Sequence, residues 1–318
     1  MRVVVVGGGS WGSAFARLLV ERGHETTLAC RDPEQVRAIR DSGRNPRYLD
    51  GMHLGAVVAT TIAEAGIADA DLVVVAVPSR AYAEVVAALP GSAPVLSLTK
   101  GLDPATGARL STLVQGRPVA ALSGPTFAEE IAAGLPAAAV IASAETELAL
   151  RLQHEINSTI FRVYVNGDLT GVELCAAAKN VIALAAGGVD GLGLGDNAKA
   201  GLITRGLAEM ARLGEACGAR PETFAGLAGM GDLMVSCWSR HGRNRRAGEL
   251  IARGSTPAQA AAQIGTTVEG LTTAPALRDL SRRLEVELPI TESVCAVLEG
   301  GSLPELIASI MGRRPKAE

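Results

Sequence analysis

Aromatic side chains are scarce in this 318-residue chain, where they make up only 3% of the residues. Apolar residues nevertheless reach 48%, and charged residues make up 20%. These proportions are typical of a globular protein with an extensive core. Much of the apolar share is alanine, beside 37 glycines, so we expect backbones to pack closely. The length itself favours two domains over one.

An excess of charge of one sign is also lacking, because 30 Lys and Arg stand against 33 Asp and Glu, a net charge of −3 at pH 7. This balance excludes an electrostatic case for a nucleic-acid partner. The cysteines contain no C-x-x-C pair, and we expect reduced thiols in a cytosolic protein and no metal site. The five are Cys30, Cys175, Cys217, Cys237 and Cys295.

Long apolar runs are absent as well, since none approaches the length that crosses a membrane. The chain starts in a predicted strand, which leaves no room for the basic and apolar regions of a signal peptide. We therefore expect a cytoplasmic protein without membrane insertion. The basic end, residues 312–318, is expected to fray.

The chain is organised around residues 1–16, MRVVVVGGGSWGSAFA. Four consecutive valines predict a strand buried on both faces of a parallel sheet. A helix is predicted from residue 11 to about 22, with Gly23 just beyond its end.

Between this strand and helix, three glycines have G-x-G-x-x-G spacing. Gly7 permits a tight turn, Gly9 lets the backbone approach a pyrophosphate, and Gly12 lets the helix pack on the strand. The N–H groups of Ser10, Trp11 and Gly12 would then face the diphosphate at a helix N-terminus. Because the triplet lies between a strand and a helix, it predicts dinucleotide binding rather than only a tight turn.

The second predicted strand, residues 25–31, ends where such folds meet the adenosine ribose. An acidic residue there favours NAD, whereas this chain has Arg31, which could pair with a 2′-phosphate and favour NADP. Asp32 follows it, and the alternative for Arg31 is a surface role beside a helix that starts at Pro33.

Strands and helices alternate over the first half and then give way to helices alone. Beyond the strands at residues 1–6 and 25–31, further strands are predicted at residues 71–78, 94–99, 118–123, 137–142 and 161–165. Together they indicate an α/β fold with a doubly wound, Rossmann-like sheet. Helices are predicted at residues 79–89, 145–157, 169–186, 199–217, 245–253, 256–263 and 273–284. We place the domain boundary at this switch, which predicts a dinucleotide-binding domain over 1–167 and an all-helical substrate domain over 168–318.

Two positions beyond predicted strand ends could meet a ligand, because ligands bind outside the carboxyl ends of strands in such sheets. Lys100 suits an anionic or carbonyl ligand, and its alternative is a solvated loop. Thr126 with Glu129 matches a capping box, beside backbone donors at a helix N-terminus. Ser79 is predicted to cap the helix that follows it.

Lys179 lies in ELCAAAKNVIALAAGG, where its helical neighbours are nearly all apolar. Glu173 is six residues away, so no i+3 or i+4 ion pair explains the lysine. Burial would lower the pKa of Lys179 toward the range of proton transfer, whereas the alternative is a stem that carries the ammonium to water. Asn180 could orient a ligand or face solvent.

A second polar cluster follows in LAGMGDLMVSCWSRHGRNRR, residues 227–246. Asp232 is an acid in an apolar context, and Arg240, Arg243, Arg245 and Arg246 follow it. Arginines at a helix N-terminus oppose the helix dipole, which favours a bound phosphate over a solvated charge run.

Eight motifs in order identify the chain as similar to the bacterial-type NAD(P)-dependent sn-glycerol-3-phosphate dehydrogenases, from the first strand almost to the end. They are GGGSWGSAFA, VVVAVPS, SLTKGL, SGPTFAEEIAAGLP, ELCAAAKNVIALAAGGVDGLGLGDNAKAGLITRGL, GLAGMGDL, GRNRR and VEGLTTA. The resemblance implies reversible reduction of dihydroxyacetone phosphate to sn-glycerol 3-phosphate, which supplies phospholipid synthesis. It implies NADP(H) or NAD(H) as cofactor, a phosphotriose substrate and a homodimer.

The resemblance also implies roles for individual residues. Those expected at the cofactor are Gly7, Gly9, Ser10, Trp11, Gly12, Arg31, Tyr48, Lys100, Ala128, Arg243 and Glu269. Those expected at the substrate are Lys100, Gly124, Thr126, Lys179, Asp232, Gly242, Arg243 and Asn244. Lys179 is the expected general acid/base, with Lys100 and Asp232 as its catalytic partners.

Gly242 departs from the pattern, because a serine is expected before Arg243 and Asn244. A backbone contact to the phosphate would survive this change, whereas a hydroxyl contact would not. Two other functions stay open: a reductase of the β-hydroxyacid or ketopantoate type, which would need a carboxylate clamp, and a non-catalytic NADPH-binding sensor.

Overall fold

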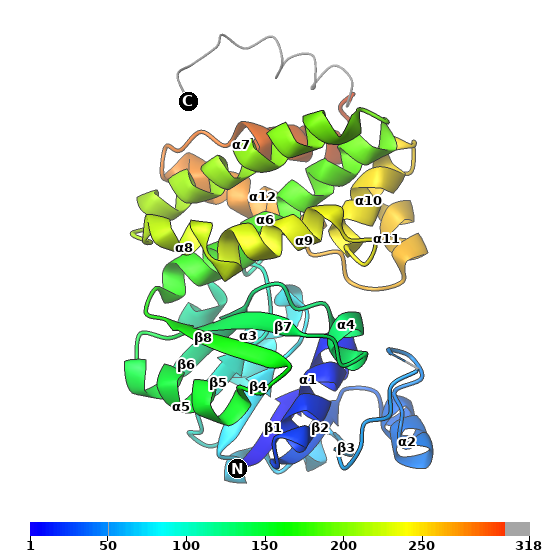
Figure 1. Cartoon of the computed structure of the whole chain (residues 1–318), viewed down its shortest axis with the longest axis vertical. Helices are drawn as coiled ribbons and strands as arrows, with labels where there is room; N and C mark the ends of the chain where they lie inside the picture. The colour runs from blue at the N-terminus through cyan, green and yellow to red at the C-terminus, as the bar shows by residue number, and fades with distance from the viewer. Residues whose placement is uncertain (50, 303–318) are drawn as a thin grey trace.

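The computed structural model describes residues 1–49 and 51–302. It divides into a half built on a sheet, which contains the N-terminus, and a half built of helices (Figure 1). The predicted 312–318 tail lies outside the described residues. The class predicted from the sequence, a doubly wound α/β sheet with an all-helical region after it, is confirmed.

Eight strands form one sheet in the order β3-β2-β1-β4-β5-β6-β7-β8. All neighbours are parallel except β6 and β7, which are antiparallel. The strands are β1 (Arg2–Val6), β2 (Glu25–Cys30), β3 (Val58–Thr61), β4 (Leu72–Val75), β5 (Val95–Ser97), β6 (Val119–Ser123), β7 (Ala137–Ala142) and β8 (Phe161–Asn166). The sequence reasoning missed β3, a short strand at the edge of the sheet whose first residue is exposed, and the antiparallel pair.

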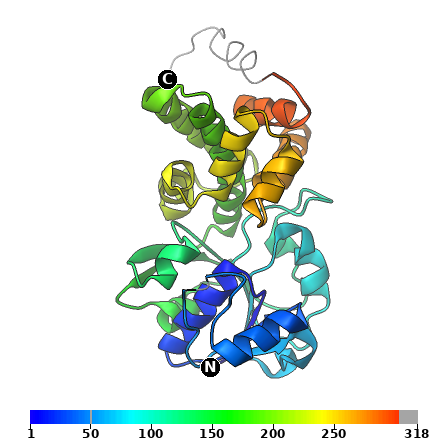
Figure 2. The same cartoon turned by 90° about the vertical axis from the view of Figure 1, so that its right-hand side faces the viewer.

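Helices cover both faces of the sheet (Figure 2). The valine run of β1 alternates between them: Val3 and Val5 pack with α1 and α5, while Val4 and Val6 pack with α3. A strand buried on both faces therefore needs no polar alternation. The helices of this half are α1 (Ser10–Glu21), α2 (Pro33–Ser42), α3 (Ser79–Ala87), α4 (Ala128–Ala132) and α5 (Thr146–Ile156), with 3₁₀ turns η1 (Ile62–Glu64), η2 (Ile67–Asp69) and η3 (Leu110–Leu113).

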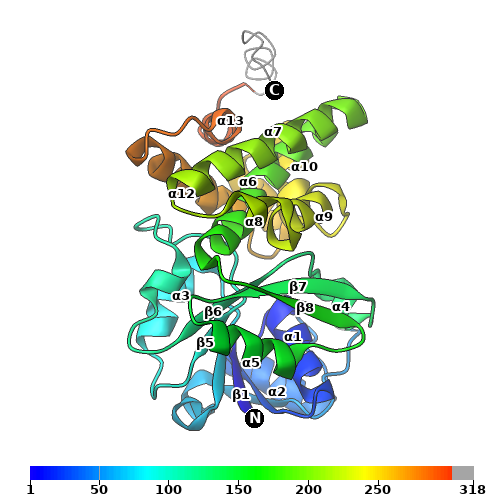
Figure 3. The same ribbon diagram turned by 60° about the vertical axis from the view of Figure 1, so that its left-hand side comes forward.

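The second half packs around one long central helix, α6 (Leu169–Gly191), as Figure 3 shows. Its other helices are α7 (Gly195–Ala216), α8 (Pro221–Ala225), the π-helix η4 (Leu227–Gly231), α9 (Asp232–Trp238), α10 (Arg243–Ala252), α11 (Pro257–Ile264), α12 (Gly270–Arg283) and α13 (Pro289–Leu298).

Glycines bring α6 and α10 into backbone contact. A Cβ placed on Gly187 would overlap the carbonyl of Arg245, and one on Gly248 would overlap the carbonyl of Leu184. The low content of bulky residues thus serves close helix packing. By length and composition α6 is apolar enough to cross a membrane, but 94% of its most apolar window is buried inside the protein. It is a core helix.

Candidate active site

The turn after β1 fits a dinucleotide diphosphate. Gly7 has φ +121°, and a Cβ there would overlap the carbonyl of Ala76, which follows β4. A Cβ on Gly12 would overlap the carbonyl of Gly7, so the helix needs glycine to approach the turn. Gly9 faces open space and is an N-cap without a side-chain acceptor, which leaves the first N–H groups of α1 to an anion.

Two charged residues follow β2: Asp32 has hydrogen-bonding partners, whereas Arg31 faces solvent. Asp32 caps α2 by accepting from the Glu34 N–H at 2.9 Å, and it pairs with Arg47 at 3.3 Å. Arg31 is exposed, and within the described residues its guanidinium has no hydrogen bond or ion pair. The Arg31 guanidinium is therefore accessible at the end of β2, and its predicted role at a 2′-phosphate stays a prediction. The Arg47 guanidinium, which pairs with Asp32, lies 6.0 Å from the ring centre of Tyr48. Tyr48 is therefore also near the end of β2.

Two further predicted cofactor residues lie near α1. Trp11 packs against Phe15 and Phe161, with ring centres 5.4 and 6.4 Å away. Its indole nitrogen is buried without a hydrogen-bond partner among the described residues. Ala128 is buried at the first turn of α4.

The centre of the site is Asp232, which joins two lysines from the two halves of the chain. Its Oδ1 accepts from Lys179 Nζ at 2.6 Å, and its Oδ2 accepts from Lys100 Nζ at 2.7 Å. Lys179 comes from the middle of α6, Lys100 follows β5, and Asp232 begins α9 directly after the π-helix η4. Such local π-helices occur often at functional sites.

Lys179 and Asp232 are almost completely buried, with relative exposures of 6% and 2%. The Lys179 ammonium thus ends at Asp232 and Ser236, whose Oγ lies 2.9 Å away, and it does not reach water as the alternative interpretation of the sequence requires. The Lys100 ammonium also donates to the Gly124 carbonyl at 2.9 Å and to Thr126 Oγ1 at 3.4 Å. It is therefore not a solvated loop lysine.

These contacts set the protonation states. Burial lowers the pKa of Lys179 to about 8, against the opposing effect of Asp232 and with the positive charge of Lys100 adding to the decrease. Burial alone would raise the pKa of Asp232, but the two ammonium groups outweigh it and hold that pKa below its usual range. At neutral pH the cluster is a carboxylate between two cations, and one of these cations can release its proton at mildly basic pH.

The residues of the arginine-rich segment, 240–246, lie in different environments. Arg243 is exposed at the first turn of α10. Arg245 instead pairs with Asp190 at 2.7 Å and Glu249 at 3.2 Å, so it holds α10 against α6. Gly242 is buried, and a Cβ there would lie 2.7 Å from the carbonyl oxygen of Ser236. A side chain at this position would therefore require the Ser236 carbonyl or α10 to shift.

Asn244 belongs to an amide network that reaches the lysine segment. Its Nδ2 donates to Asn180 Oδ1 at 2.8 Å, and its Oδ1 accepts from the Gly270 N–H at 2.8 Å. Asn180 Nδ2 lies 3.4 Å from the Lys100 carbonyl oxygen. Asn180 therefore faces neighbouring polar groups and not solvent.

Two capping predictions were wrong. The N-cap of α3 is Pro78, and Ser79 donates instead to Glu269, a residue whose sequence context was uninformative. The N-cap of α4 is Phe127, and Thr126 donates to the Gly124 carbonyl at 3.1 Å. Ser79 is already the first helical residue and Thr126 lies one residue before the N-cap, so neither hydroxyl is at the position where a side chain accepts from the first free N–H groups of the helix.

Sequence reasoning also missed Ser236. Its spacing of one helical turn from Asp232 was the signal that could have found it. The partners of Asn180 and Ser79 come from distant segments, so no local pattern reveals them.

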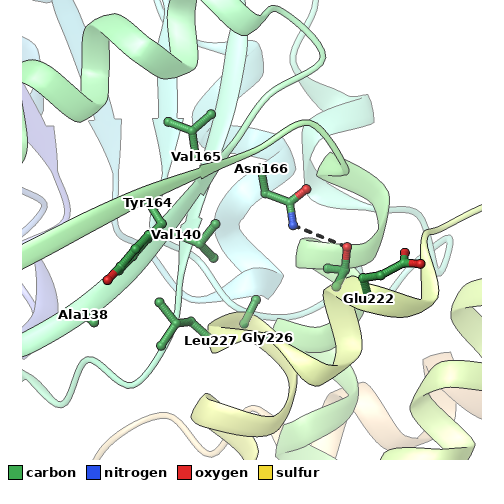
Figure 4. Close-up of a pocket in the computed structure, with 10 residues that line it drawn as sticks. Ala138, Val140, Tyr164, Val165, Asn166, Glu222, Gly226 and Leu227 are labelled. Carbon is green, nitrogen blue, oxygen red and sulfur yellow. Dashed lines mark hydrogen bonds between the residues drawn. The ribbon is translucent and has the colours of Figure 1, made fainter.

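A separate cavity of about 380 Å³ lies between β7, β8, α8 and η4 (Figure 4). Its walls are mostly apolar, and the Asn166 amide at its rim donates to Thr223 Oγ1 at 3.3 Å. None of the residues that line it is a lysine or arginine, so it lacks the charges that a phosphate requires.

Comparisons with known proteins agree with this geometry. The family models described as NAD-dependent glycerol-3-phosphate dehydrogenase N-terminus and C-terminus match residues 2–149 and 168–309. The chain is 43% identical to a glycerol-3-phosphate dehydrogenase (NAD(P)+) of Moorella thermoacetica, over 98% of this chain and 96% of the relative. It is 42% identical to the protein of that name from Bacillus cereus, over 100% and 97%.

Among solved structures, glycerol-3-phosphate dehydrogenase from Coxiella burnetii superposes with a TM-score of 0.94 at 34% identity, covering 98% of this chain and 99% of that one. A ketopantoate reductase from Ralstonia eutropha, at 20% identity and a TM-score of 0.61, covers 94% and 97% and shares the fold. The site, the motifs and the full-length similarity together show that the chain belongs to the NAD-dependent glycerol-3-phosphate dehydrogenase family.

Proposed function

We propose that this protein reduces dihydroxyacetone phosphate reversibly to sn-glycerol 3-phosphate with NAD(P)H. The observation that carries the proposal is the ion-pair cluster of Lys179, Asp232 and Lys100, which joins the half that has the dinucleotide turn to the half that has the exposed Arg243. The named relatives support the same reaction. We further propose that the product supplies glycerophospholipid synthesis in the cytoplasm.

The two halves have different tasks in this proposal. Residues 1–167 bind the cofactor, with Arg31 taking the 2′-phosphate of NADP(H) and the glycine turn taking the diphosphate. Residues 168–318 hold the substrate and the acid/base. Arg243 and the free N–H groups in the first turn of α10, that of Asn244 among them, take the substrate phosphate, because an exposed guanidinium and N–H donors at a helix N-terminus favour an anion. The Gly242 N–H already donates to the Ser239 carbonyl at 3.1 Å, so it is not counted among these donors. We expect a homodimer.

When bound, the nicotinamide supplies the hydride that reaches the carbonyl carbon. In the reducing direction Lys179 Nζ donates its proton to the carbonyl oxygen of the substrate. Its pKa of about 8 suits this step, because a group titrating near the working pH both holds and releases a proton readily. Lys100 Nζ stabilises the negative charge that develops on that oxygen.

Asp232 orients both lysines, since each of its oxygens accepts from one of them. It also keeps Lys179 mostly protonated at neutral pH by opposing the effect of burial. Thr126 and the Gly124 carbonyl hold the Lys100 ammonium in the same place. The residues thus pre-organise charge where the reaction needs it, without reorganisation during turnover.

The first test follows NADPH oxidation through the absorbance of the reduced nicotinamide, with and without dihydroxyacetone phosphate. A panel with 2-oxo acids that carry a carboxylate and no phosphate separates the proposed reaction from a ketopantoate-type reduction. Oxidation only with the carboxylate substrates would contradict the proposal. Binding of NADPH without oxidation of any substrate would instead indicate a sensor.

The second test is Lys179→Ala. We expect turnover to fall by at least about 10²-fold, because general acid/base catalysis contributes about that much or more, while NADPH affinity stays near normal. Lys199→Ala is the matched control: Lys199 is also buried and pairs with an aspartate, Asp190, at 2.8 Å in the helical half. The control should lose thermal stability and keep turnover. Normal kcat in Lys179→Ala would exclude Lys179 as the acid.

A further inference from the structure

Ser79 and Glu269 form a clasp between the two halves of the chain. Ser79 Oγ donates to Glu269 Oε2 at 2.5 Å, and the Ser79 N–H donates to Oε1 at 3.1 Å. Ser79 is the first residue of α3, and Glu269 directly precedes α12. Because each carboxylate oxygen accepts one of these bonds, the orientation of the carboxylate is set by a single serine.

The clasp lies at the place where the sheet order reverses. The strand order runs from β1 to β2 on one side and to β4 on the other, and ligands bind at such a switch point. Ser79 follows β4 by a short turn that begins at Ala76, whose carbonyl lies against Gly7 of the cofactor turn. The residue that fixes the Glu269 carboxylate therefore comes from the sheet half and lies three residues after Ala76, which packs against the cofactor turn.

The clasp also borders the lysine segment. A Cβ placed on Gly101, the neighbour of Lys100, would lie 3.0 Å from Ser79 Cβ and 3.3 Å from Glu269 Oε2. The carboxylate thus lies next to the backbone segment that carries Lys100, one of the proposed catalytic lysines.

The surroundings explain why Glu269 needs its partner. Burial raises the pKa of this carboxyl, and the hydrogen bonds from Ser79 are the first of the contacts that oppose the increase, before the charges of Arg243 and Arg80. Ser79 itself is 1% exposed. A buried hydroxyl that donates to a half-buried carboxylate stabilises the charged form and restricts its rotation.

We propose that Ser79 is a positioning residue for cofactor binding, which acts by holding the Glu269 carboxylate in an acceptor geometry toward the dinucleotide. The inference rests on the proposed function only in that the protein binds a nicotinamide dinucleotide. Each Glu269 oxygen keeps a free lone pair for a hydroxyl or amide donor of the cofactor. An acceptor that is already oriented binds more tightly because less freedom is lost on association.

The test measures NADPH affinity of the full-length protein by fluorescence titration, alongside the KM for NADPH and kcat. We expect Ser79→Ala to weaken NADPH binding by about tenfold, the effect of losing one hydrogen bond to a charged group, with kcat within about twofold of wild type. Ser79→Thr, which keeps a hydroxyl, should restore the affinity. Glu269→Gln should weaken binding by a similar factor.

The double variant Ser79→Ala/Glu269→Gln decides whether Ser79 acts through Glu269. If it does, the double variant binds NADPH no more weakly than Glu269→Gln alone, because the two losses are not independent. Losses that multiply in the double variant overturn the proposal, and so does unchanged affinity in Ser79→Ala.

Ser111 provides a matched control. Its Oγ donates to Glu173 Oε2 at 2.6 Å and its N–H donates to Oε1 at 2.7 Å, the same two-bond pattern between the halves but with a different glutamate. Ser111→Ala should lower the unfolding temperature and leave the Kd for NADPH within about twofold. An equal loss of affinity in both variants would mean that any clasp between the halves suffices, which overturns the specific role of Ser79.

A wild-type protein that binds NADPH but does not reduce dihydroxyacetone phosphate contradicts the proposed reaction, while these titrations still decide the role of Ser79.

Discussion

Replacing Asp232 by asparagine should move the pH at which the enzyme stops reducing its substrate. The carboxylate is 2% exposed and accepts from Lys179 at 2.6 Å and from Lys100 at 2.7 Å. Asparagine keeps the shape of the side chain but removes the charge between two ammonium groups. Of the main influences on the pKa of Lys179, burial and Lys100 lower it while Asp232 raises it. The substitution therefore removes the main influence that keeps this lysine protonated.

The size of the effect follows from the charges. At an effective dielectric constant of about 20, two unit charges about 4 Å apart interact by about 4 kcal/mol. One pKa unit corresponds to about 1.4 kcal/mol, so even a third of that interaction lowers the pKa of Lys179 by about one unit. Starting from about 8, the group would titrate near or below pH 7. Protonated Lys179 would then be the minor form at pH 7.5.

The assay is kcat for NADPH oxidation with saturating dihydroxyacetone phosphate between pH 6 and 9.5. In the wild type, reduction should fall as the pH rises through about 8, because the acid is lost. In Asp232→Asn the decrease should begin at least about one unit lower. Asp190→Asn, which removes a carboxylate partner of Lys199 and Arg245 in the helical half, should leave the midpoint unchanged. An identical midpoint in the wild type and in Asp232→Asn would refute the reasoning.

Two further predictions concern cofactor choice and stability. Arg31→Ala should weaken NADPH binding by roughly tenfold or more, because a charge-assisted contact to the 2′-phosphate is lost; parallel titrations with NADH should show little change, and equal losses would remove the 2′-phosphate argument. Burial raises the pKa of Glu209 to about 7, although it accepts hydrogen bonds from the N–H groups of Ile290 and Thr291. The folded state therefore binds more protons than the unfolded one above the usual pKa of 4.5, and stability should decrease by about 3 kcal/mol as the pH rises from 4.5 to 7. Glu209→Gln should flatten this part of the stability profile in denaturant unfolding at several pH values, and a slope equal to that of the wild type would contradict it.

Local patterns were enough for most of the sheet half. The valine run, the glycine spacing and the helix that follows are consecutive in the chain, so their physics is visible without neighbours. Strand β3 was not predicted from the sequence because it is a short edge strand, Val58–Thr61, whose first residue is exposed. The antiparallel pairing of β6 and β7 escaped because strand direction depends on how the connection crosses the sheet, which residue patterns do not record.

The two wrong helix-cap predictions, Ser79 and Thr126, show that local sequence patterns do not fix the partners of a hydroxyl group. Ser79 is the first residue of α3 and Thr126 lies two residues before α4, and each has the hydroxyl that a cap needs. In the fold Glu269 takes the first hydroxyl, and the Gly124 carbonyl takes the second. The N-cap positions are instead Pro78 and Phe127, and only the packing of the two halves brings Glu269 within reach of Ser79.

The sequence by itself determined that a dinucleotide turn opens the chain, that helices replace strands after about residue 167, and that Lys179 has no charged partner within its own helix. Only the tertiary structure decided what that lysine contacts. Asp232 is 53 residues from Lys179 and 132 residues from Lys100 along the chain, yet it accepts from both at 2.6 and 2.7 Å. The pKa of about 8 depends on burial and on these two distant charges together. A property that arises from through-space electrostatics in a dry interior has no signature in the order of residues.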